Sequence, residues 1–238
     1  MSAAWTELAG GDAPDGCDVL VIADHASATV PAGIDLGVPA DAMRRHIAVD
    51  IGVAAVAARL GFRAVLGGVS RLVIDYNREA DSPGLIPIES DGTVVPGNVG
   101  ADREARLADY YRPYHDHVAQ LVAAMRPRLI VSLHSFTPQL ATRPEEARPW
   151  EIGILYNRDE RAARIALPLL GEAGVLAGDN LPYSGRVLNA TMNAHAEANG
   201  IPYLGIEVRQ DLIGNDAGAA DWAARLRPII LSVAAAVG

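Results

Sequence analysis

Short apolar runs alternate with longer helical patterns along most of this chain, and this alternation constrains the fold more than any other feature. Runs such as DVLVIA (18–23) and LIVSL (129–133) have the length and composition of buried strands. The alanine-rich stretch 40–60 stops at Gly61 and predicts one continuous helix. Strands that alternate with helices form a largely parallel sheet whose two faces the helices cover. The sequence therefore predicts an α/β fold.

The same signals place the remaining elements. Further strands are expected at 63–66, 71–77, 152–156 and 203–209, and further helices at 102–126, 159–170, 190–199 and 218–237. Pro113 should kink or restart the helix over 102–126, because proline cannot donate the helical hydrogen bond. The 238 residues contain no internal repeat, low-complexity tract or Gly/Ser linker, so we expect one domain over residues 1–238.

Composition excludes several classes of function. The net charge of −9 argues against nucleic acid or an anionic membrane as a partner, and the absence of lysine excludes Schiff-base chemistry by lysine. The single cysteine, Cys17, excludes a disulfide framework and a multi-cysteine zinc site; we expect it to be a small buried residue. The chain starts without signal-peptide features and contains no membrane-spanning apolar run, so we expect a soluble, cytoplasmic protein.

Polar side chains follow four predicted strands at the point where each strand ends. The four sequences are DHAS (24–27), DYNR (75–78), HSF (134–136) and EVRQD (207–211). In sheets covered on both faces, ligands bind at the carboxyl ends of the strands. The sequence therefore predicts an active site at this edge of the sheet.

Two histidines at separate strand ends, His25 and His134, are candidate metal ligands, because imidazole suits zinc. Taken singly, each is more often a hydrogen-bonded core residue, but together they indicate a site. A catalytic zinc takes a third protein ligand, often a carboxylate. On a helix over 40–60, His46 and Asp50 would share one face, either as candidates for that ligand or as a local pair. No HExxH motif supports the metal independently.

Charged residues at the other strand ends suggest catalysis and substrate binding. Glu207 lies in a run that is otherwise typical of a buried strand, and burial suits it to act as a general base; an ion pair with Arg209 is the alternative. Arg209 is otherwise a candidate substrate-binding residue. Asn77 and Arg78 suit a substrate carboxylate, although Arg78 could pair with the aspartate three residues before it. Arg71 is either a second cation of the site or a solvated strand end.

The motifs resemble those of the N-formylglutamate amidohydrolase family, within the zinc carboxypeptidase and aspartoacylase-like superfamily. They occur in family order through most of the chain: DHASATVP (24–31), RHIAVDIG (45–52), SRLVIDYNR (70–78), YRPYH (111–115), LHSFTP (133–138), RPWEIGILY (148–156) and IEVRQDL (206–212). The resemblance implies a three-layer α/β/α sandwich of the phosphorylase/hydrolase-like type around a mostly parallel mixed sheet. It also implies one zinc ion per chain at the strand ends.

The resemblance implies His25 and His134 as the two histidine ligands of zinc. The superfamily's usual third ligand is a glutamate three residues after the first histidine, and this chain has Ala28 there. Asp50 is therefore the expected substitute, with His46 beside it as a rival ligand or an orienting neighbour.

The resemblance also assigns roles to the other charged residues. Asn77 and Arg78 correspond to the pair that holds a substrate carboxylate, Arg71 to the arginine that polarises the scissile carbonyl, and Glu207 to the general base. Asp24 stands where many relatives have proline, which suggests a subfamily.

The implied activity is zinc-dependent hydrolysis of the amide bond of an N-acyl amino acid such as N-formylglutamate, which is a small acidic substrate. The products would be the carboxylic acid and the free amino acid. Another N-acyl amino acid deacylase or a small metallocarboxypeptidase would use the same residues. A binding protein for an acidic metabolite is the alternative from a different class. A serine hydrolase finds no support, because no GxSxG motif is present.

Overall fold

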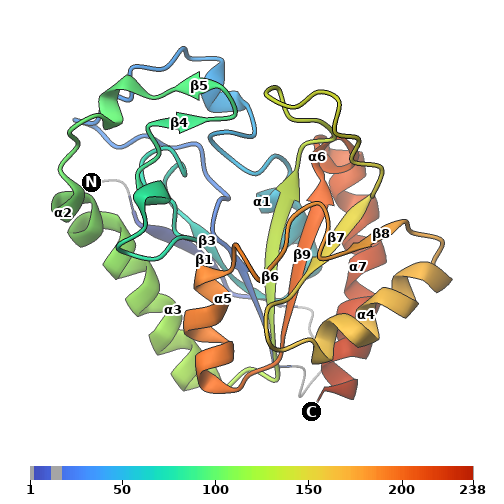
Figure 1. Ribbon diagram of the computed structural model, residues 1–238. Helices are drawn as coiled ribbons and strands as arrows, with labels where there is room; N and C mark the ends of the chain where they lie inside the picture. Colours follow the sequence, from blue (N-terminus) through green and yellow to red (C-terminus); the bar gives the residue numbers. More distant parts are fainter. Residues whose placement is uncertain (1–2, 12–17, 238) are drawn as a thin grey trace.

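A seven-stranded mixed sheet with helices on both faces forms the centre of the computed structural model, which describes residues 3–11 and 18–237 (Figure 1). The predicted α/β sandwich is thereby confirmed; Cys17 lies outside the described residues. The strand order is β1-β3-β2-β6-β9-β7-β8. The strands are β1 Trp5–Leu8, β2 Val19–Ala23, β3 Arg63–Gly67, β6 Leu129–Phe136, β7 Ile152–Leu155, β8 Ala177–Asp179 and β9 Tyr203–Arg209.

The four central strands run in the same direction. Strand β2 pairs in parallel with β3 and with β6, and β6 pairs in parallel with β9. On the flanks, β1 is antiparallel to β3 and β7 is antiparallel to β9, while β8 runs parallel to β7. Every residue of β6 is buried, as expected for a strand covered on both faces. The carboxyl ends of β2, β6 and β9 therefore meet at one edge of the sheet.

Helices cover both faces of this sheet (Figure 1). On one face, α7 packs against both α1 and α4, and on the other face α3 and α5 pack together. None of the helices in the described ranges is long and apolar enough to cross a membrane. The helices are α1 Val53–Leu60, α2 Arg103–Arg106, α3 Arg112–Met125, α4 Arg161–Glu172, α5 Ala190–His195, α6 Gln210–Ile213 and α7 Asp216–Ala236.

Short helical turns and a hairpin connect these elements. The hairpin pairs β4 (Glu89–Ser90) with β5 (Thr93–Val94) in antiparallel fashion. The expected interruption near Pro113 is present, because a π-helical turn directly precedes α3. The turns are η1 Ala42–Arg44, η2 Pro83–Leu85, η3 Pro96–Asn98, the π-helical η4 Leu107–Tyr111 and η5 Glu197–Asn199.

The prediction of one helix over 40–60 is wrong before Val53, where α1 begins. Gly52 adopts a left-handed conformation with φ of 82°, which ends any helical path that enters from the preceding turns. A side chain at Gly52 would collide with the backbone of Ile213 in α6. The backbone N–H of Asp50 donates to the carbonyl of His25 at 2.9 Å instead of to a helical neighbour. Residue 50 is therefore held against the end of β2 and not on a helix.

The prediction of a strand over 71–77 is also wrong. Leu72 and Val73 are buried, as their apolar character indicates, but they form turns without a strand partner. The side chain of Asn98 donates to the carbonyl of Leu72 at 2.8 Å, and Arg106 donates to the carbonyl of Val73 at 2.7 Å. Buried backbone groups must be paired, and here polar side chains provide partners that a sheet would otherwise supply.

Candidate active site

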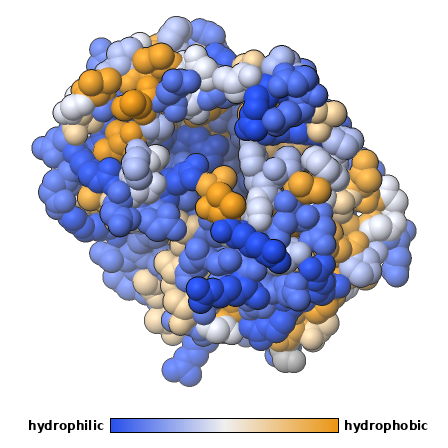
Figure 2. All heavy atoms as spheres, in the orientation of Figure 1, coloured by the Kyte–Doolittle hydropathy of each residue, from blue (hydrophilic) through white to orange (hydrophobic). Residues whose placement is uncertain are grey.

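A cavity of about 810 Å³ opens at the carboxyl ends of the central strands. The surface is hollowed near the centre of the face shown in Figure 2, and most of the residues in and around this hollow are hydrophilic. Its mouth lies between the β4–β5 hairpin and the loop 137–149 that follows β6. The Asp91 carboxylate, at the hairpin turn, joins these two rims by accepting backbone hydrogen bonds from Ala141 at 2.9 Å and Thr142 at 3.0 Å. A cavity of this volume accommodates a small organic substrate.

Three buried side chains converge in this cavity: His25 after β2, His134 in β6 and Asp50 before α1. The two imidazole Nδ1 atoms are 3.2 Å apart, and Asp50 Oδ2 lies 2.9 Å from His134 Nδ1 and 3.5 Å from His25 Nδ1. The backbone N–H of Ser135 also donates to Asp50 Oδ2, at 3.3 Å. The structure therefore brings together the three residues that the sequence analysis selected as metal ligands.

A further carboxylate faces the Nε2 atom of each imidazole. His25 Nε2 lies 2.7 Å from Asp75 Oδ1, and His134 Nε2 lies 3.4 Å from Asp24 Oδ2. The hydroxyl of Tyr114 donates to the other oxygen of Asp24 at 2.7 Å. Burial alone would raise the pKa values of both aspartates, but attraction to His25 holds the pKa of Asp75 well below its ordinary value, and the His134 contact lowers that of Asp24. Two ionised carboxylates thus face the Nε2 atoms of the two histidines.

The donor chemistry of this cluster fits a divalent metal such as zinc. Asp75 and Asp24 lie at the Nε2 atoms of the two rings, so a proton retained on each Nε2 would leave both Nδ1 atoms, which face each other and Asp50, able to bind a metal. Two imidazoles, each oriented by a carboxylate, together with a third carboxylate form a ligand set typical of catalytic zinc.

Glu207 lies beside this cluster on the adjacent strand, because its Cα is paired in register with that of His134. The side chain is buried, and its Oε2 has no hydrogen-bond partner in the described part of the chain. Burial raises the pKa of Glu207 to about 8, and the nearby negative charge of Asp50 acts in the same direction. This carboxylate therefore binds a proton near neutral pH.

Arg209 does not form the ion pair with Glu207 that the sequence allowed. Its guanidinium Nε donates to Asp211 Oδ1 at 2.8 Å, and the residue does not line the cavity. The structure thus places Arg209 apart from the other candidate substrate-binding residues.

Arg71 spans the middle of the candidate site. Its NH1 donates to Asp50 Oδ1 at 3.1 Å, and its NH2 contacts Nδ1 of His25. Although burial opposes the charge, Asp50, Asp75 and Glu207 together raise the pKa of Arg71. A permanent cation therefore lies directly against the candidate metal ligands.

Asn77 and Arg78 line the cavity next to His25. The side-chain oxygen of Asn77 accepts from the backbone N–H of Thr191 at 3.1 Å, which leaves the amide NH₂ available. Arg78 Nε lies 3.6 Å from Asp75 Oδ2, so the structural pair that the sequence allowed is present at the same time. The amide and the guanidinium form a polar wall that suits a carboxylate.

His46 also lines the cavity but lies farther from the cluster, with Nε2 3.8 Å from Asp50 Oδ1. Burial lowers the pKa of His46 to about 4, so its imidazole is neutral at pH 7. The cluster of potential metal ligands in the described residues contains Asp50 and not His46. His46 therefore lies beside Asp50, outside the group of potential metal ligands.

Sequence reasoning missed Tyr183, which lines the cavity from the loop between β8 and α5. The buried Arg148 donates to its hydroxyl at 3.0 Å and lies over its ring. No periodic pattern marks this loop, so only contact across the fold reveals the residue. The partner roles of Asp24 and Asp75 were also missed, although both adjoin the motifs that end predicted strands.

The model of the N-formylglutamate amidohydrolase family matches residues 17–214. The chain belongs to this family. Gene product Atu2144 from Agrobacterium tumefaciens, whose crystal structure is known, is 34% identical to this chain in sequence. The two structures align with a TM-score of 0.89 over 97% of this chain and 94% of that one. The N-formylglutamate amidohydrolase from Ralstonia eutropha JMP134 is 22% identical and shares the fold, with a TM-score of 0.73 over 99% and 98%. No protein with a curated function matches. Membership of the family supports amide hydrolysis as the activity.

Proposed function

We propose that this member of the N-formylglutamate amidohydrolase family is a zinc-dependent hydrolase of N-acyl amino acids, with N-formylglutamate as the reference substrate. The observation that carries the proposal is the convergence of His25, Asp50 and His134 beside the unpartnered carboxylate of Glu207. These three residues would hold the zinc ion. When bound, zinc acts as a Lewis acid and lowers the pKa of its water to about 7.

Glu207 is the proton carrier of the proposed reaction. Its free Oε2 accepts the proton of the attacking water and then delivers it to the leaving nitrogen. Burial, which raises the pKa of Glu207, increases its affinity for this proton, as the role of general base requires. The water oxygen becomes part of the released carboxylic acid, and the amino acid leaves as the free amine.

The cations of the cavity position the substrate. Arg71, held by Asp50, donates to the carbonyl oxygen of the scissile amide as negative charge develops there, a contact whose loss costs about 10²–10³-fold in rate. Asn77 and Arg78 hold the carboxylate of the amino acid, which selects N-acyl amino acids over simple amides.

The buried, unpartnered Glu207 also favours the hydrolase over a protein that only binds its ligand. In a binding protein for an acidic metabolite, Glu207 would be buried without a partner and without benefit. A general base requires this same environment. A single domain, a cytoplasmic location and an acidic small molecule as the partner, without nucleic acid or membrane, stay predictions from the sequence.

Metal content and turnover of N-formylglutamate together test the proposal. We expect about one zinc per wild-type chain by plasma mass spectrometry, little in His134→Ala, and release of free glutamate only by the zinc-loaded wild type. His117→Ala is the matched control, because it removes a histidine on α3 that contacts Glu7 and does not line the cavity. Wild-type protein that takes up no zinc and hydrolyses no N-acyl amino acid would overturn the proposal.

A further inference from the structure

The cavity continues below the catalytic residues along the same face of the sheet. His134 and Glu207 face each other in the register of β6 and β9, and two residues earlier Ser132 is paired with Gly205. Gly205 is in turn paired with Leu155 of β7. Because side chains alternate along a strand, residues two apart lie on one face, separated by about 7 Å. Ser132, Gly205 and Leu155 also line the cavity, so they form a deeper row beneath the reacting centre.

The segment before α5 closes this deeper part of the cavity through Leu188 and Asn189, which line it as well. The Asn189 amide NH₂ donates to the hydroxyl of Tyr203 at 2.9 Å. Tyr203 lies two residues before Gly205 on β9, so its hydroxyl and Asn189 mark the bottom. We call the region lined by Ser132, Leu155, Leu188, Asn189 and Gly205 the floor pocket.

The floor pocket adjoins the polar wall proposed to hold the substrate carboxylate. Asn77 accepts a hydrogen bond from the backbone N–H of Thr191, which lies two residues after Asn189. Asn77 is therefore bound to the same chain segment that closes the floor pocket. The reacting centre, with Glu207, lies directly above the deeper row. An amino acid held by its α-carboxylate at Asn77 and by its nitrogen near Glu207 therefore extends its side chain into the floor pocket.

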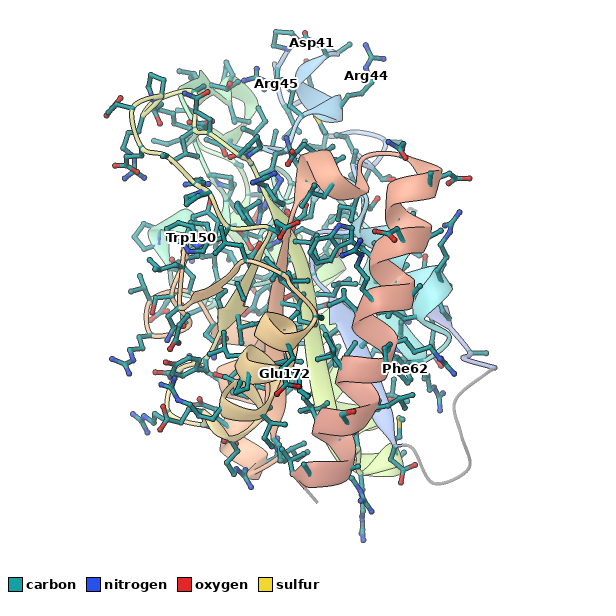
Figure 3. All side chains as sticks on the ribbon, turned by 90° about the vertical axis from the view of Figure 1, so that its right-hand side faces the viewer. Asp41, Arg44, Arg45, Phe62, Trp150 and Glu172 are labelled. Atoms are coloured by element: carbon teal, nitrogen blue, oxygen red, sulfur yellow. The ribbon has the colours of Figure 1, made fainter. Side chains whose placement is uncertain are left out.

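All five residues of the floor pocket are uncharged. The arginines that line the cavity lie elsewhere: Arg71 is bound to Asp50 and Arg78 lies beside Asp75. Arg44 and Arg45 are exposed on the turn that includes η1, and Figure 3 labels both at the top of the molecule, above the strand ends. The fifth, Arg143, is exposed in the rim loop and paired with Glu146.

The polar atoms of the floor pocket match a neutral side chain. The hydroxyl of Ser132 forms no hydrogen bond with the described residues. Asn189 donates from its NH₂ to Tyr203 and Asn193, so its carbonyl oxygen is the atom available to a ligand. None of the five residues offers a cation to balance the charge of a carboxylate beside this oxygen, whereas a carboxamide could donate to it.

We propose that the floor pocket binds the side chain of the substrate's amino acid and selects an uncharged one, so that an N-acylglutamine is a better substrate than the corresponding N-acylglutamate. This inference rests on the proposed function, in which Asn77 and Arg78 hold the α-carboxylate. It narrows the substrate class to N-acyl amino acids with uncharged side chains.

The test compares N-formyl-L-glutamine with N-formyl-L-glutamate on the zinc-loaded enzyme, because these substrates have nearly the same shape and differ in charge. We expect kcat/KM to be at least about tenfold higher for the glutamine derivative, since a buried polar group left without a partner costs this much or more. Leu188→Arg places a cation in the floor pocket and should reverse the preference. Val187→Arg is the matched control, because Val187 is 79% exposed and does not line the cavity.

The outcomes separate this inference from the function on which it rests. Equal or faster hydrolysis of N-formylglutamate by the wild type would overturn the neutral floor pocket and leave the hydrolase intact. Failure to hydrolyse N-formylglutamine, N-formylglutamate and N-formylmethionine would overturn the proposed function itself. If Leu188→Arg does not fold, Ser132→Ala should lower kcat/KM severalfold for the glutamine derivative and not for the methionine derivative; equal effects on both would contradict the inference.

Discussion

Replacing Asp75 by asparagine should weaken zinc binding without removing a ligand. Asp75 Oδ1 lies 2.7 Å from His25 Nε2, and the residue is only 8% exposed. Its carboxylate, whose pKa is held low despite burial mainly by His25, increases the electron density on the opposite ring nitrogen. An asparagine oxygen can still accept this hydrogen bond, but the negative charge that strengthens it is lost.

The expected loss is about 10–100-fold in zinc affinity, the range observed for carboxylates that orient metal-binding histidines. This corresponds to about 1.4–2.8 kcal/mol in binding free energy. The substitution also removes the negative charge beside Arg78, whose Nε lies 3.6 Å from Asp75 Oδ2. Turnover would therefore combine two effects, and zinc affinity must be measured directly.

The measurement is a competition titration in which the metal-free protein competes with a chromophoric chelator for zinc. Asp81→Asn is the matched control, since Asp81 is an exposed aspartate of the same segment and does not line the cavity. It makes the same change in net charge. Zinc affinity of Asp75→Asn within twofold of both the wild type and the control would refute the argument that Asp75 tunes the site through His25.

Three further predictions concern catalysis and stability. Glu207→Gln should lower kcat by at least about 100-fold while zinc content stays at the wild-type level; a kcat within tenfold of wild type would assign the proton transfer elsewhere. Arg78→Ala should lower kcat/KM for N-formyl amino acids by about 10–100-fold, the value of hydrogen bonds to a charged group, whereas Arg143→Ala at the rim should change it less than threefold; equal effects would remove Arg78 from the carboxylate site. With zinc removed by a chelator, raising the pH from 5 to 9 should lower the stability of the wild type relative to that of Glu207→Gln. Burial raises the pKa of Glu207 from 4.5 to about 8. Between these two pH values the folded state therefore binds more protons than the unfolded state. The stability that protonated Glu207 contributes below pH 4.5 is lost as the pH rises through this range. Parallel Tm values across this range would contradict the shifted pKa.

The strand that precedes His25 and the strands that contain His134 and Glu207 could be predicted from the sequence, because each combines an apolar run with an abrupt polar end. Parallel strands end at one edge, so residues distant in the sequence were expected to meet there. The structure places Glu207 directly beside His134, as this reasoning required.

The predictions failed where the hydrogen bonds of the backbone are made outside a regular strand or helix. The apolar run at 71–77 is buried as expected, yet Asn98 and Arg106 supply its hydrogen bonds from elsewhere in the chain. Asp50 lies beside the histidines because its backbone N–H is bound to the carbonyl of His25, and no helical spacing accounts for that position.

The sequence by itself determined the family, the α/β architecture and the edge of the sheet where the chemistry gathers, because these depend on local periodicity and on motifs. Only the tertiary structure decided which groups face one another. Asp24 and Asp75 stand behind the two imidazoles, Arg209 lies apart from the cavity, and an uncharged floor pocket extends beneath Glu207. Such facts depend on contacts between residues far apart in the chain, for which a local pattern contains no signal.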